Sequence, residues 1–157
     1  MPSFKNLADL NKYINTKLIQ SMDKVGETAK QHMYDYVKKE MESRPEDKLV
    51  YERTWEYLNS ISRTKATYVY GAIVVFIEYN TDKIHPYITT DGTFNQHADL
   101  WNEDTSDFIP LWLEFGTDND IHSHKPVGGL IDLEKWVKLN FKKELMNELR
   151  KLGIQTK

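Results

Sequence analysis

The stretch from residue 3 to residue 42, SFKNLADLNKYINTKLIQSMDKVGETAKQHMYDYVKKEME, largely decides the fold. Its apolar residues recur at steps of three and four, which is the spacing of one stripe along an α-helix. Ser3 is the expected N-cap, and Pro45 ends the pattern. Gly26 interrupts the stripe, so the pattern allows either one long helix or two helices with a break near Gly26. A single helix over this range would be roughly 60 Å long, and it must then bend or lie on a neighbouring subunit.

The composition of the whole chain limits the classes of protein to which it can belong. Its 157 residues predict a single domain over residues 1–157, with 39% hydrophobic and 29% charged residues. No cysteine is present, which excludes disulfides, thiolate zinc sites and cysteine nucleophiles. The net charge of −3 does not favour binding to nucleic acid, because proteins that bind the phosphate backbone are usually positively charged. The N-terminus lacks an apolar signal core, and the longest apolar run, residues 72–77, is too short for a membrane span. We therefore expect synthesis in the cytoplasm and no membrane partner.

The middle of the chain carries the signals for β-structure. The run TYVYGAIVVFIEY, residues 67–79, is rich in β-branched and aromatic residues and predicts a central strand that is apolar on both faces. Residues 85–94 predict a short edge strand with a turn at Asp91-Gly92. In FIPLWLEFG, residues 111–115 predict a further strand, at whose start Pro110 is tolerated.

Two more segments complete the expected layout. Residues 55–61, with apolar positions at steps of three, fit a short helix or an irregular packed segment. Residues 130–152 predict an amphipathic helix, and Gly153 is its expected stop. The fold class that follows is α+β: a long N-terminal helix, a small, mostly antiparallel β-sheet with long loops, and a C-terminal amphipathic helix.

The histidines raise the question of a metal site. Four of the five lie between residues 85 and 124: His85, His97, His122 and His124. His122 and His124, with Asp118 and Asp120 nearby, would supply nitrogen and oxygen ligands of the kind zinc accepts. These histidines are scattered over predicted loops, and no His-Glu-X-X-His helix is present. We therefore expect loop histidines, with no metal and no cofactor.

The candidates for acid–base catalysis are the carboxylates Glu114, Asp118 and Asp120. Nothing in the sequence pairs them with a nucleophile or an oxyanion donor, and no P-loop or dinucleotide fingerprint is present. We expect no enzyme activity. A small metal-dependent enzyme that uses His122 and His124 is the alternative from another functional class.

Aromatic residues are the more informative signal, because they make up 12% of the chain. Tyr and Trp favour interfaces, since each has a large apolar body and a polar tip. The most prominent are Trp55, Tyr57, Tyr68, Tyr70, Trp101, Trp112 and Trp136. We expect core packing to account for some of them and a subunit interface for others. The basic clusters, at Lys38-Lys39 and in the C-terminal tail, lie among acidic residues and fit solvated helix faces.

Three pieces of the sequence resemble a phage family, in the family's order. YERTWEYLNSI, residues 51–61, resembles a segment of the form R-T-G-x-L-x-x-S-I, with Trp55 in place of Gly. PLWLEFGT, residues 110–117, resembles the family's Tyr-Val-Glu-Tyr/Phe-Gly-Thr segment. KPVGG, residues 125–129, precedes the C-terminal helix where relatives have a Pro-Phe pair. The family comprises the tail-completion, or head–tail joining (neck), proteins of long-tailed bacteriophages and prophages, which are small proteins with a long N-terminal helix.

The resemblance implies a non-enzymatic structural protein of the virion. Such proteins assemble as rings, commonly hexameric, that join the capsid connector to the tail. A tail terminator and a connector adaptor are the related alternatives. The implied partners are other copies of the chain, the connector or adaptor, and the tail tube or terminator proteins, with DNA passing through the lumen without sequence-specific binding.

The loops that the resemblance assigns to neighbour contacts are residues 80–107 and 117–129. The predicted interface residues are Trp101, Trp112, Glu114, Phe115, Gly116, Thr117, His122, His124 and Pro126. Among these, Gly116 is expected to allow a positive φ at the end of its motif.

Overall fold

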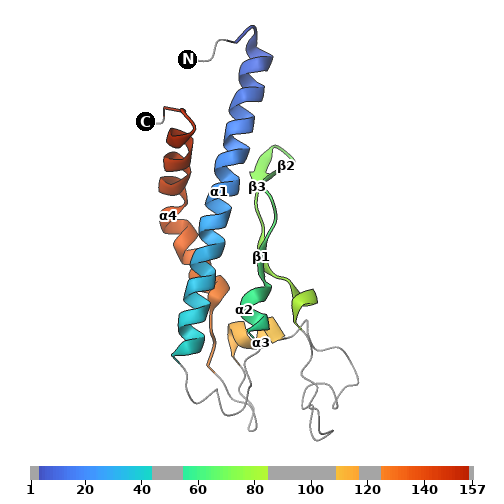
Figure 1. Cartoon of the computed structure of the whole chain (residues 1–157), viewed down its shortest axis with the longest axis vertical. Coiled ribbons are helices and arrows are strands. Elements are labelled where there is room, and N and C mark those ends of the chain that lie inside the picture. The colour runs from blue at the N-terminus through green and yellow to red at the C-terminus, as the bar shows by residue number, and fades with distance from the viewer. Residues whose placement is uncertain (1–3, 44–54, 85–108, 117–124, 156–157) are drawn as a thin grey trace, which may run out of the picture. The chain divides into compact units, whose positions relative to one another are not determined.

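The computed structural model describes residues 4–43, 55–84, 109–116 and 125–155 (Figure 1). A long N-terminal helix, short antiparallel strands and a C-terminal helix are all present, so the predicted α+β fold class is confirmed. The chain divides into two compact units. Unit 1 comprises Met1–Gln31, Arg63–Ile77 and Leu133–Lys157, and unit 2 comprises His32–Ser62 and Glu78–Asp132. Each of the two long helices therefore contributes residues to both units.

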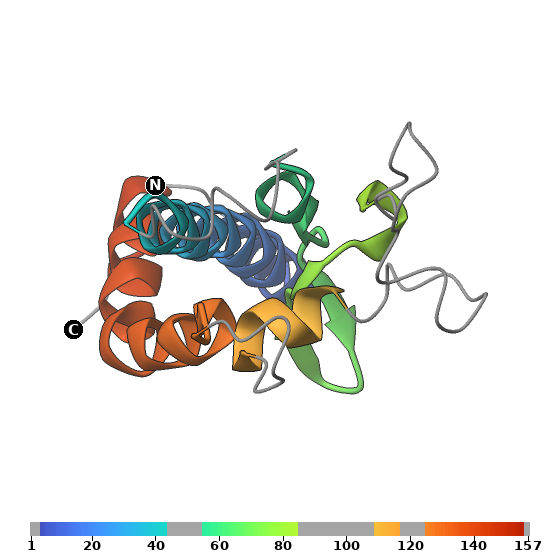
Figure 2. The ribbon, with the colours of Figure 1, turned by 90° about the horizontal axis from the view of Figure 1, so that it is seen from below.

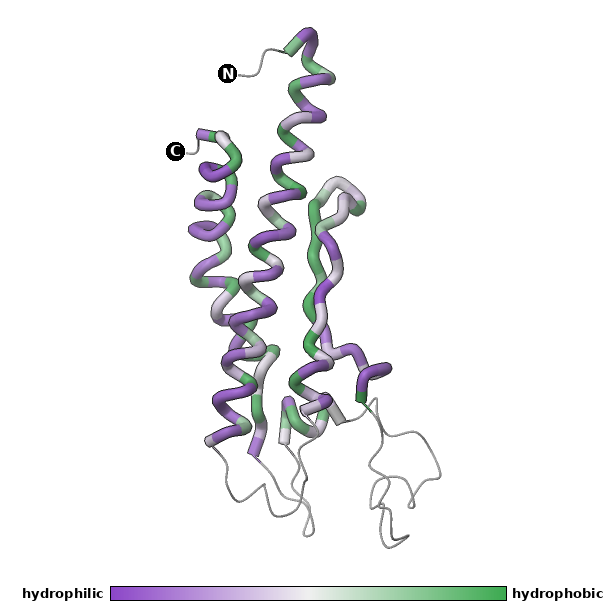
Figure 3. Tube along the Cα trace, viewed as in Figure 1, coloured by the Kyte–Doolittle hydropathy of each residue, from purple (hydrophilic) through white to green (hydrophobic). Residues whose placement is uncertain are grey.

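Helix α1, Leu7–Glu42, runs without a break for 36 residues. Asn6 caps its start, because the Asn6 Oδ1 atom accepts a hydrogen bond from the backbone N–H of Asp9 at 2.8 Å. Ser3, the predicted N-cap, lies outside the described residues. Hydrophobic and hydrophilic residues alternate from turn to turn along the helix, in agreement with the apolar spacing of the sequence (Figure 3). The alternative of two helices with a break near Gly26 is wrong.

Gly26 has a packing role within unit 1 instead. A Cβ built at this position would lie 2.7 Å from Cγ1 of Val75 and 3.3 Å from its Cγ2. Both distances are shorter than the 3.5–4.0 Å or so at which carbon atoms pack favourably. The missing side chain of Gly26 thus lets the segment that carries Val75 approach α1 closely.

Residues 67–79 do not form the single central strand that their composition predicts. They fold back on themselves, so that β2, Thr67–Val69, pairs antiparallel with β3, Ala72–Val74. The chain reverses at Tyr70 and Gly71, whose φ values are 47° and 87°. β-Branched and aromatic residues favour extended backbone in either arrangement. The reversal is therefore decided by the two positive φ values and not by the apolar pattern.

A second two-stranded sheet, made by β1 (Ile61–Arg63) and β4 (Ile77–Tyr79), occupies the arms of the same hairpin. The hydrophobic run of the returning arm is visible in Figure 3. The strands of this returning arm, β3 and β4, are half-buried or exposed, whereas the sequence predicts a fully buried central strand.

The two ladders are out of register by one residue, and the offset itself lies in unit 1. Thr64 faces Phe76, since its N–H donates to the Phe76 carbonyl at 2.9 Å. The next pair, at the start of β2, is offset by one position, so Lys65 and Ala66 together oppose Val75 alone. This arrangement is a β-bulge, which bends the arm and leaves an amide without a partner in the ladder.

Unit 2 contains the remaining short elements: α2 (Glu56–Ser60), the 3₁₀ helix η2 (Thr81–Lys83) and α3 (Ile109–Phe115). Of the two alternatives for residues 55–61, a short helix or an irregular packed segment, the structure shows the short helix, α2. The buried apolar residues of this unit form its core: Met33, Val37, Met41, Tyr57, Leu58, Ile61, Ile84 and Val127.

The strand predicted at residues 111–115 is wrong, because these residues lie in α3. Pro110 falls in the first turn of this helix, where its missing N–H costs nothing. No β-branched residue follows Ile109 in the helix, and Leu and Glu favour it. Over so short an apolar run, the helical and extended periods cannot be told apart from sequence.

Helix α4, Gly129–Lys151, is the predicted C-terminal helix. Its first turn lies in unit 2 beside α3 (Figure 2). Its end lies in unit 1, where the N–H of Ile154 donates to the Leu149 carbonyl at 3.0 Å and the N–H of Gly153 donates to the Arg150 carbonyl at 3.0 Å. Gly153 has a φ of 83°, so the predicted stop is confirmed as a Schellman motif.

Candidate assembly surface

Exposed apolar side chains lie at the end of the β2–β3 hairpin, in unit 1. Tyr68 is 61% exposed and Tyr70 is fully exposed at 105%. Val69 between them is also exposed, and Gly71 completes the turn. We call Tyr68, Val69, Tyr70 and Gly71 the hairpin tip. Aromatic side chains presented together to solvent are typical of a surface that another molecule covers.

Tyr70 combines this exposure with an unfavourable backbone conformation. Its φ of 47° lies in the left-handed region, which costs a residue with a Cβ about 1 kcal/mol. Two-residue turns of this kind usually carry Asn or Asp before the Gly, because those side chains tolerate the conformation. Strain held at an exposed position is typical of a functional site. We therefore identify Tyr70 as the tip residue best suited to contact a partner.

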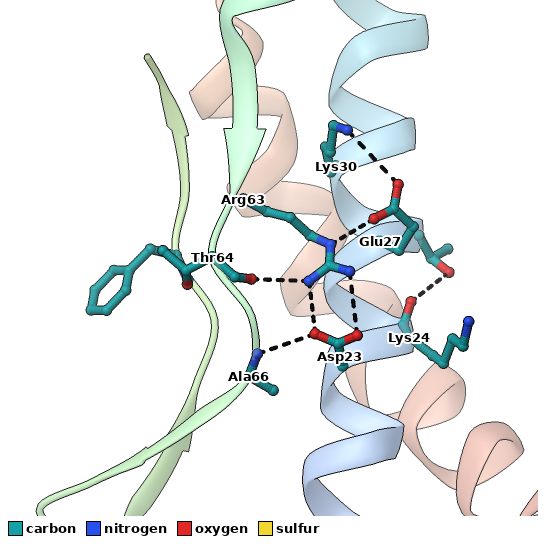
Figure 4. A network of polar contacts seen from close by, with 9 residues as sticks. Asp23, Lys24, Glu27, Lys30, Arg63, Thr64 and Ala66 are labelled. Atoms are coloured by element: carbon teal, nitrogen blue, oxygen red, sulfur yellow. Dashed lines mark hydrogen bonds and ion pairs between the residues drawn. The ribbon is translucent and has the colours of Figure 1, made fainter.

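A polar cluster in unit 1 holds the base of the hairpin against α1 (Figure 4). Arg63 Nε donates to Glu27 Oε2 at 2.6 Å, and Arg63 Nη1 donates to Asp23 Oδ1 at 2.8 Å. The same Nη1 donates to the carbonyl of Thr64 at 2.9 Å. The Arg63 side chain is only 16% exposed, so its guanidinium is enclosed between the two carboxylates. We call Asp23, Glu27, Arg63 and Ala66 the hairpin clamp.

Asp23 also provides a partner for the bulge. Its Oδ1 accepts a hydrogen bond at 3.2 Å from the N–H of Ala66, one of the two bulged residues. The hydrogen bond from Arg63, followed by the one from Ala66, lowers the pKa of Asp23. The hydrogen bond from Arg63 likewise lowers the pKa of Glu27, and the two carboxylates raise the pKa of Arg63. The side chains of Asp23, Glu27 and Arg63 are therefore all charged at neutral pH.

A second polar cluster lies in unit 2, where it joins α3 to the first turn of α4. Glu114 is 1% exposed. Its Oε1 accepts hydrogen bonds from the N–H of Leu130 at 2.8 Å and from the N–H of Ile131 at 3.1 Å. These amides are among those that an α-helix leaves without an intrahelical partner at its start. Glu114 thus caps α4 from another helix. We call Glu114, Tyr79, Leu130 and Ile131 the helix joint.

Two stacked tyrosines complete the polar contacts of Glu114. Tyr79 Oη donates to Glu114 Oε2 at 3.2 Å and accepts from Tyr57 Oη at 2.6 Å. The ring centroids of Tyr57 and Tyr79 are 4.7 Å apart. Burial raises the pKa of both tyrosines, and the nearby charge of Glu114 adds to the increase. Both hydroxyls therefore stay protonated and serve as hydrogen-bonding groups, not as catalytic bases.

Backbone hydrogen bonds reinforce the helix joint. The N–H of Val127 donates to the Leu113 carbonyl at 2.7 Å, and the N–H of Gly128 donates to the Glu114 carbonyl at 3.2 Å. Gly128 has a φ of 71°, which directs the chain into α4. The two ends of the connection between α3 and α4 are thus held together.

Gly129 allows the tyrosine to reach the joint. A Cβ at Gly129 would lie 2.6 Å from Tyr79 Oη and 2.6 Å from Val37 Cγ2. Any larger residue would displace one of these groups, and with it the hydrogen bond to Glu114.

Five of the nine predicted interface residues are described by the structure: Trp112, Glu114, Phe115, Gly116 and Pro126. Phe115 and Pro126 are exposed, and Trp112 is half-buried. Glu114 serves the buried helix joint and does not face solvent. Gly116 has a φ of 78°, as the sequence predicts for the end of this motif.

The other four predicted interface residues, Trp101, Thr117, His122 and His124, lie outside the described residues. Asp118 and Asp120, the carboxylates of the alternative metal site, lie outside them as well. Within residues 4–43, 55–84, 109–116 and 125–155, no group of three or more His, Asp or Glu side chains is arranged to hold a metal ion.

The hairpin clamp is absent from the sequence predictions. Asp23 and Arg63 are 40 positions apart, and neither lies in a recognisable motif. The hairpin tip does carry a signal, because Gly71 interrupts an apolar run directly after Tyr70. A Gly in that position is typical of a two-residue turn.

Comparison of the chain with protein-family models, with curated proteins and with solved structures gives no match. Among the described helices, none is long and apolar enough to cross a membrane.

Proposed function

We propose that this chain is a structural subunit of the head–tail interface of a long-tailed bacteriophage or prophage, of the tail-completion or neck type. Copies of the chain form a ring, hexameric in this proposal, that joins the capsid connector to the tail. The protein acts through contacts and not through catalysis, and DNA passes through the lumen without sequence-specific binding. Its location is the virion, after synthesis in the bacterial cytoplasm.

The observation that carries this proposal is the backbone conformation at two motif positions. Gly116, the glycine of PLWLEFGT, has a φ of 78°. Trp55 stands where the family's R-T-G segment has Gly, and it has a φ of 60° and a ψ of 6°, in the left-handed region. Only Gly adopts this region without a steric cost. The resemblance therefore places Gly at two positions where this chain has a left-handed backbone.

The glutamate of the same motif supports a structural role. Glu114 is buried, and both of its carboxylate oxygens accept hydrogen bonds from its own chain. A carboxylate used in this way orients a helix and presents no open site for a substrate. The motif that carries the resemblance thus has an architectural function in this fold.

The hairpin tip offers a surface suited to subunit contacts. Tyr68 and Tyr70 expose large amphipathic rings, which are enriched among the residues that dominate interface energetics. The clamp fixes the base of the hairpin on α1, so little conformational freedom is lost when the tip is covered. These features favour an assembly subunit over a monomeric binding protein.

Electron microscopy of phage particles tests the proposal. Deletion of the gene should give DNA-filled heads and free tails, and supplying the intact chain in trans should restore joined particles. A tagged chain should give density at the head–tail junction. Joined particles in the deletion strain, or absence of the chain from purified virions, would show that the proposal is wrong.

Binding to the separated parts distinguishes the related roles. Purified chain that binds isolated tails but not heads acts as a completion or terminator protein, and binding to heads alone identifies a connector adaptor. The metal-dependent alternative is tested by elemental analysis. Stoichiometric zinc that is lost in His122→Ala would contradict a purely structural function.

A further inference from the structure

One face of α4, in unit 1, carries a stripe of exposed and half-buried residues. Six residues at steps of three and four line a shallow, open depression of about 340 Å³: Leu139, Lys142, Lys143, Met146, Asn147 and Arg150. Leu139 is 82% exposed, although it is apolar. We call these six residues the α4 stripe.

The cations of the α4 stripe have no ion-pair partners in the part of the chain that the structure describes. Two other lysines of the same helix are paired with glutamates three or four residues away. No such pair forms at Lys142, Lys143 or Arg150 within those residues. Three cations without an ion pair among the described residues, next to an exposed leucine, fit a partner that is both acidic and apolar.

The apolar part of the stripe favours a protein segment over nucleic acid. Leu139 lies at the N-terminal end of the stripe, beside Lys142 and Lys143, and Met146 lies between these lysines and Arg150. Phosphate groups gain nothing from contact with such side chains, because contacts to the DNA backbone are made by charged and polar groups. A peptide with acidic and aromatic residues would use both parts of the stripe.

We infer that the α4 stripe binds residues 98–108 of a second copy of this chain. This segment, ADLWNEDTSDF, lies outside the described residues and contains no Lys or Arg. Its acidic residues are Asp99, Glu103, Asp104 and Asp107, and its large apolar residues are Leu100, Trp101 and Phe108. Its carboxylates complement Lys142, Lys143 and Arg150, and its apolar side chains complement Leu139 and Met146. The inference rests on the proposed ring function, since it names a contact between neighbouring subunits.

Fluorescence polarisation with a labelled peptide of residues 98–108 tests the contact directly. The full chain should bind the peptide, and K142E/K143E should weaken binding at least about tenfold. The double substitution K5E/K12E is the matched control: it makes the same charge change at exposed lysines near the start of α1 and should leave affinity unchanged. A peptide with its four acidic residues replaced by Asn or Gln should not bind. Equal affinity of the intact chain and K142E/K143E would overturn the inference.

Charge exchange between copies tests whether the contact is made between subunits. K142E/K143E alone and E103K/D104K alone should each lose self-association in sedimentation velocity, whereas their mixture should recover it. A mixture that stays as dissociated as its components would overturn the inference. So would a short DNA duplex that binds the stripe more tightly than the peptide does. These solution results do not depend on the location of the chain in the virion, so failure here is distinguishable from failure of the proposed function.

Discussion

Replacing Gly26 with Ala provides the sharpest test of how the hairpin packs on α1. In an exposed helix interior, this change would stabilise the protein by about 1 kcal/mol, because Ala is the better helix former. Here the new Cβ would lie 2.7 Å from Val75 Cγ1. Rotation of the valine does not relieve the contact, since Cγ2 is at 3.3 Å and Cβ at 3.4 Å. Overpacking of this kind typically costs about 1–3 kcal/mol.

The two effects predict that G26A lowers the free energy of unfolding by up to about 2 kcal/mol in the intact chain. Val75→Ala removes both γ-carbons and leaves only the ordinary 3.4 Å contact. In the V75A background, G26A should therefore raise the free energy of unfolding, by about 1 kcal/mol. The same substitution is thus expected to change sign.

Urea unfolding of the four proteins, followed by far-UV circular dichroism, measures the cycle. The coupling energy between the two positions should be about 1–3 kcal/mol, with equal m values. Thr28→Ala is the matched control, because Thr28 is exposed in the same helix and should respond equally in both backgrounds. If G26A stabilises by the same amount with and without V75A, the close approach of Val75 to α1 does not exist and the reasoning is refuted.

Further predictions concern single side chains. Ser21 is fully buried and its Oγ has no hydrogen-bond partner among the described residues, so Ser21→Ala should raise the free energy of unfolding by about 1 kcal/mol; a loss of that size would show a hidden partner. Glu114→Gln should lower the free energy of unfolding by about 2 kcal/mol in the same assay, whereas the exposed control Glu134→Gln should leave it nearly unchanged, because Glu114 caps a helix from a buried position and Glu134 does not. Because the pKa values of Asp23 and Glu27 are lowered, their contribution to the free energy of unfolding is present above the ordinary pKa values, 3.8 and 4.5, and is lost as the pH falls through the lower folded values. Arg63→Gln should flatten this loss of stability between about pH 5 and pH 3. A pH profile parallel to that of the intact chain would exclude the clamp as the cause of the loss. Tyr70→Asn should stabilise the isolated chain by about 0.5–1 kcal/mol while reducing assembly of the proposed ring, and unchanged assembly would remove the hairpin tip from the proposed interface.

The long helices are predictable because each presents many turns of the same apolar spacing. The stop at Gly153 is predictable for a related reason, since the residue that ends the pattern is also the one that the positive φ requires. The short segments are not predictable in this way. The apolar spacing of residues 111–115 fits a strand and a helix equally well, and the preference of Leu and Glu for a helix is a weaker signal than a stripe repeated over many turns.

The contacts that build the candidate sites depend on residues far apart in sequence. Glu114 is recognisable as part of a motif, but its role follows from amides 16 and 17 positions later. The partnership of Asp23 with Arg63 has no local signature at all. The hairpin at Tyr70 is obscured because a single Gly is a weak turn signal inside an apolar run. The positive φ of Trp55 becomes interpretable only when the family's Gly at that position is compared with the backbone.

The paired backbone hydrogen bonds at the helix joint have a consequence for how the length of the connection between α3 and α4 affects stability. Val127 and Gly128 hold one end of the connection to Leu113 and Glu114 at the other, so the distance between its ends is set by the protein and not by the connection's length. Doubling the number of residues between such fixed ends costs only about 0.6 kcal/mol in closure entropy. The stability of unit 2 should therefore depend on these two backbone hydrogen bonds and only weakly on the number of residues that connect α3 to α4.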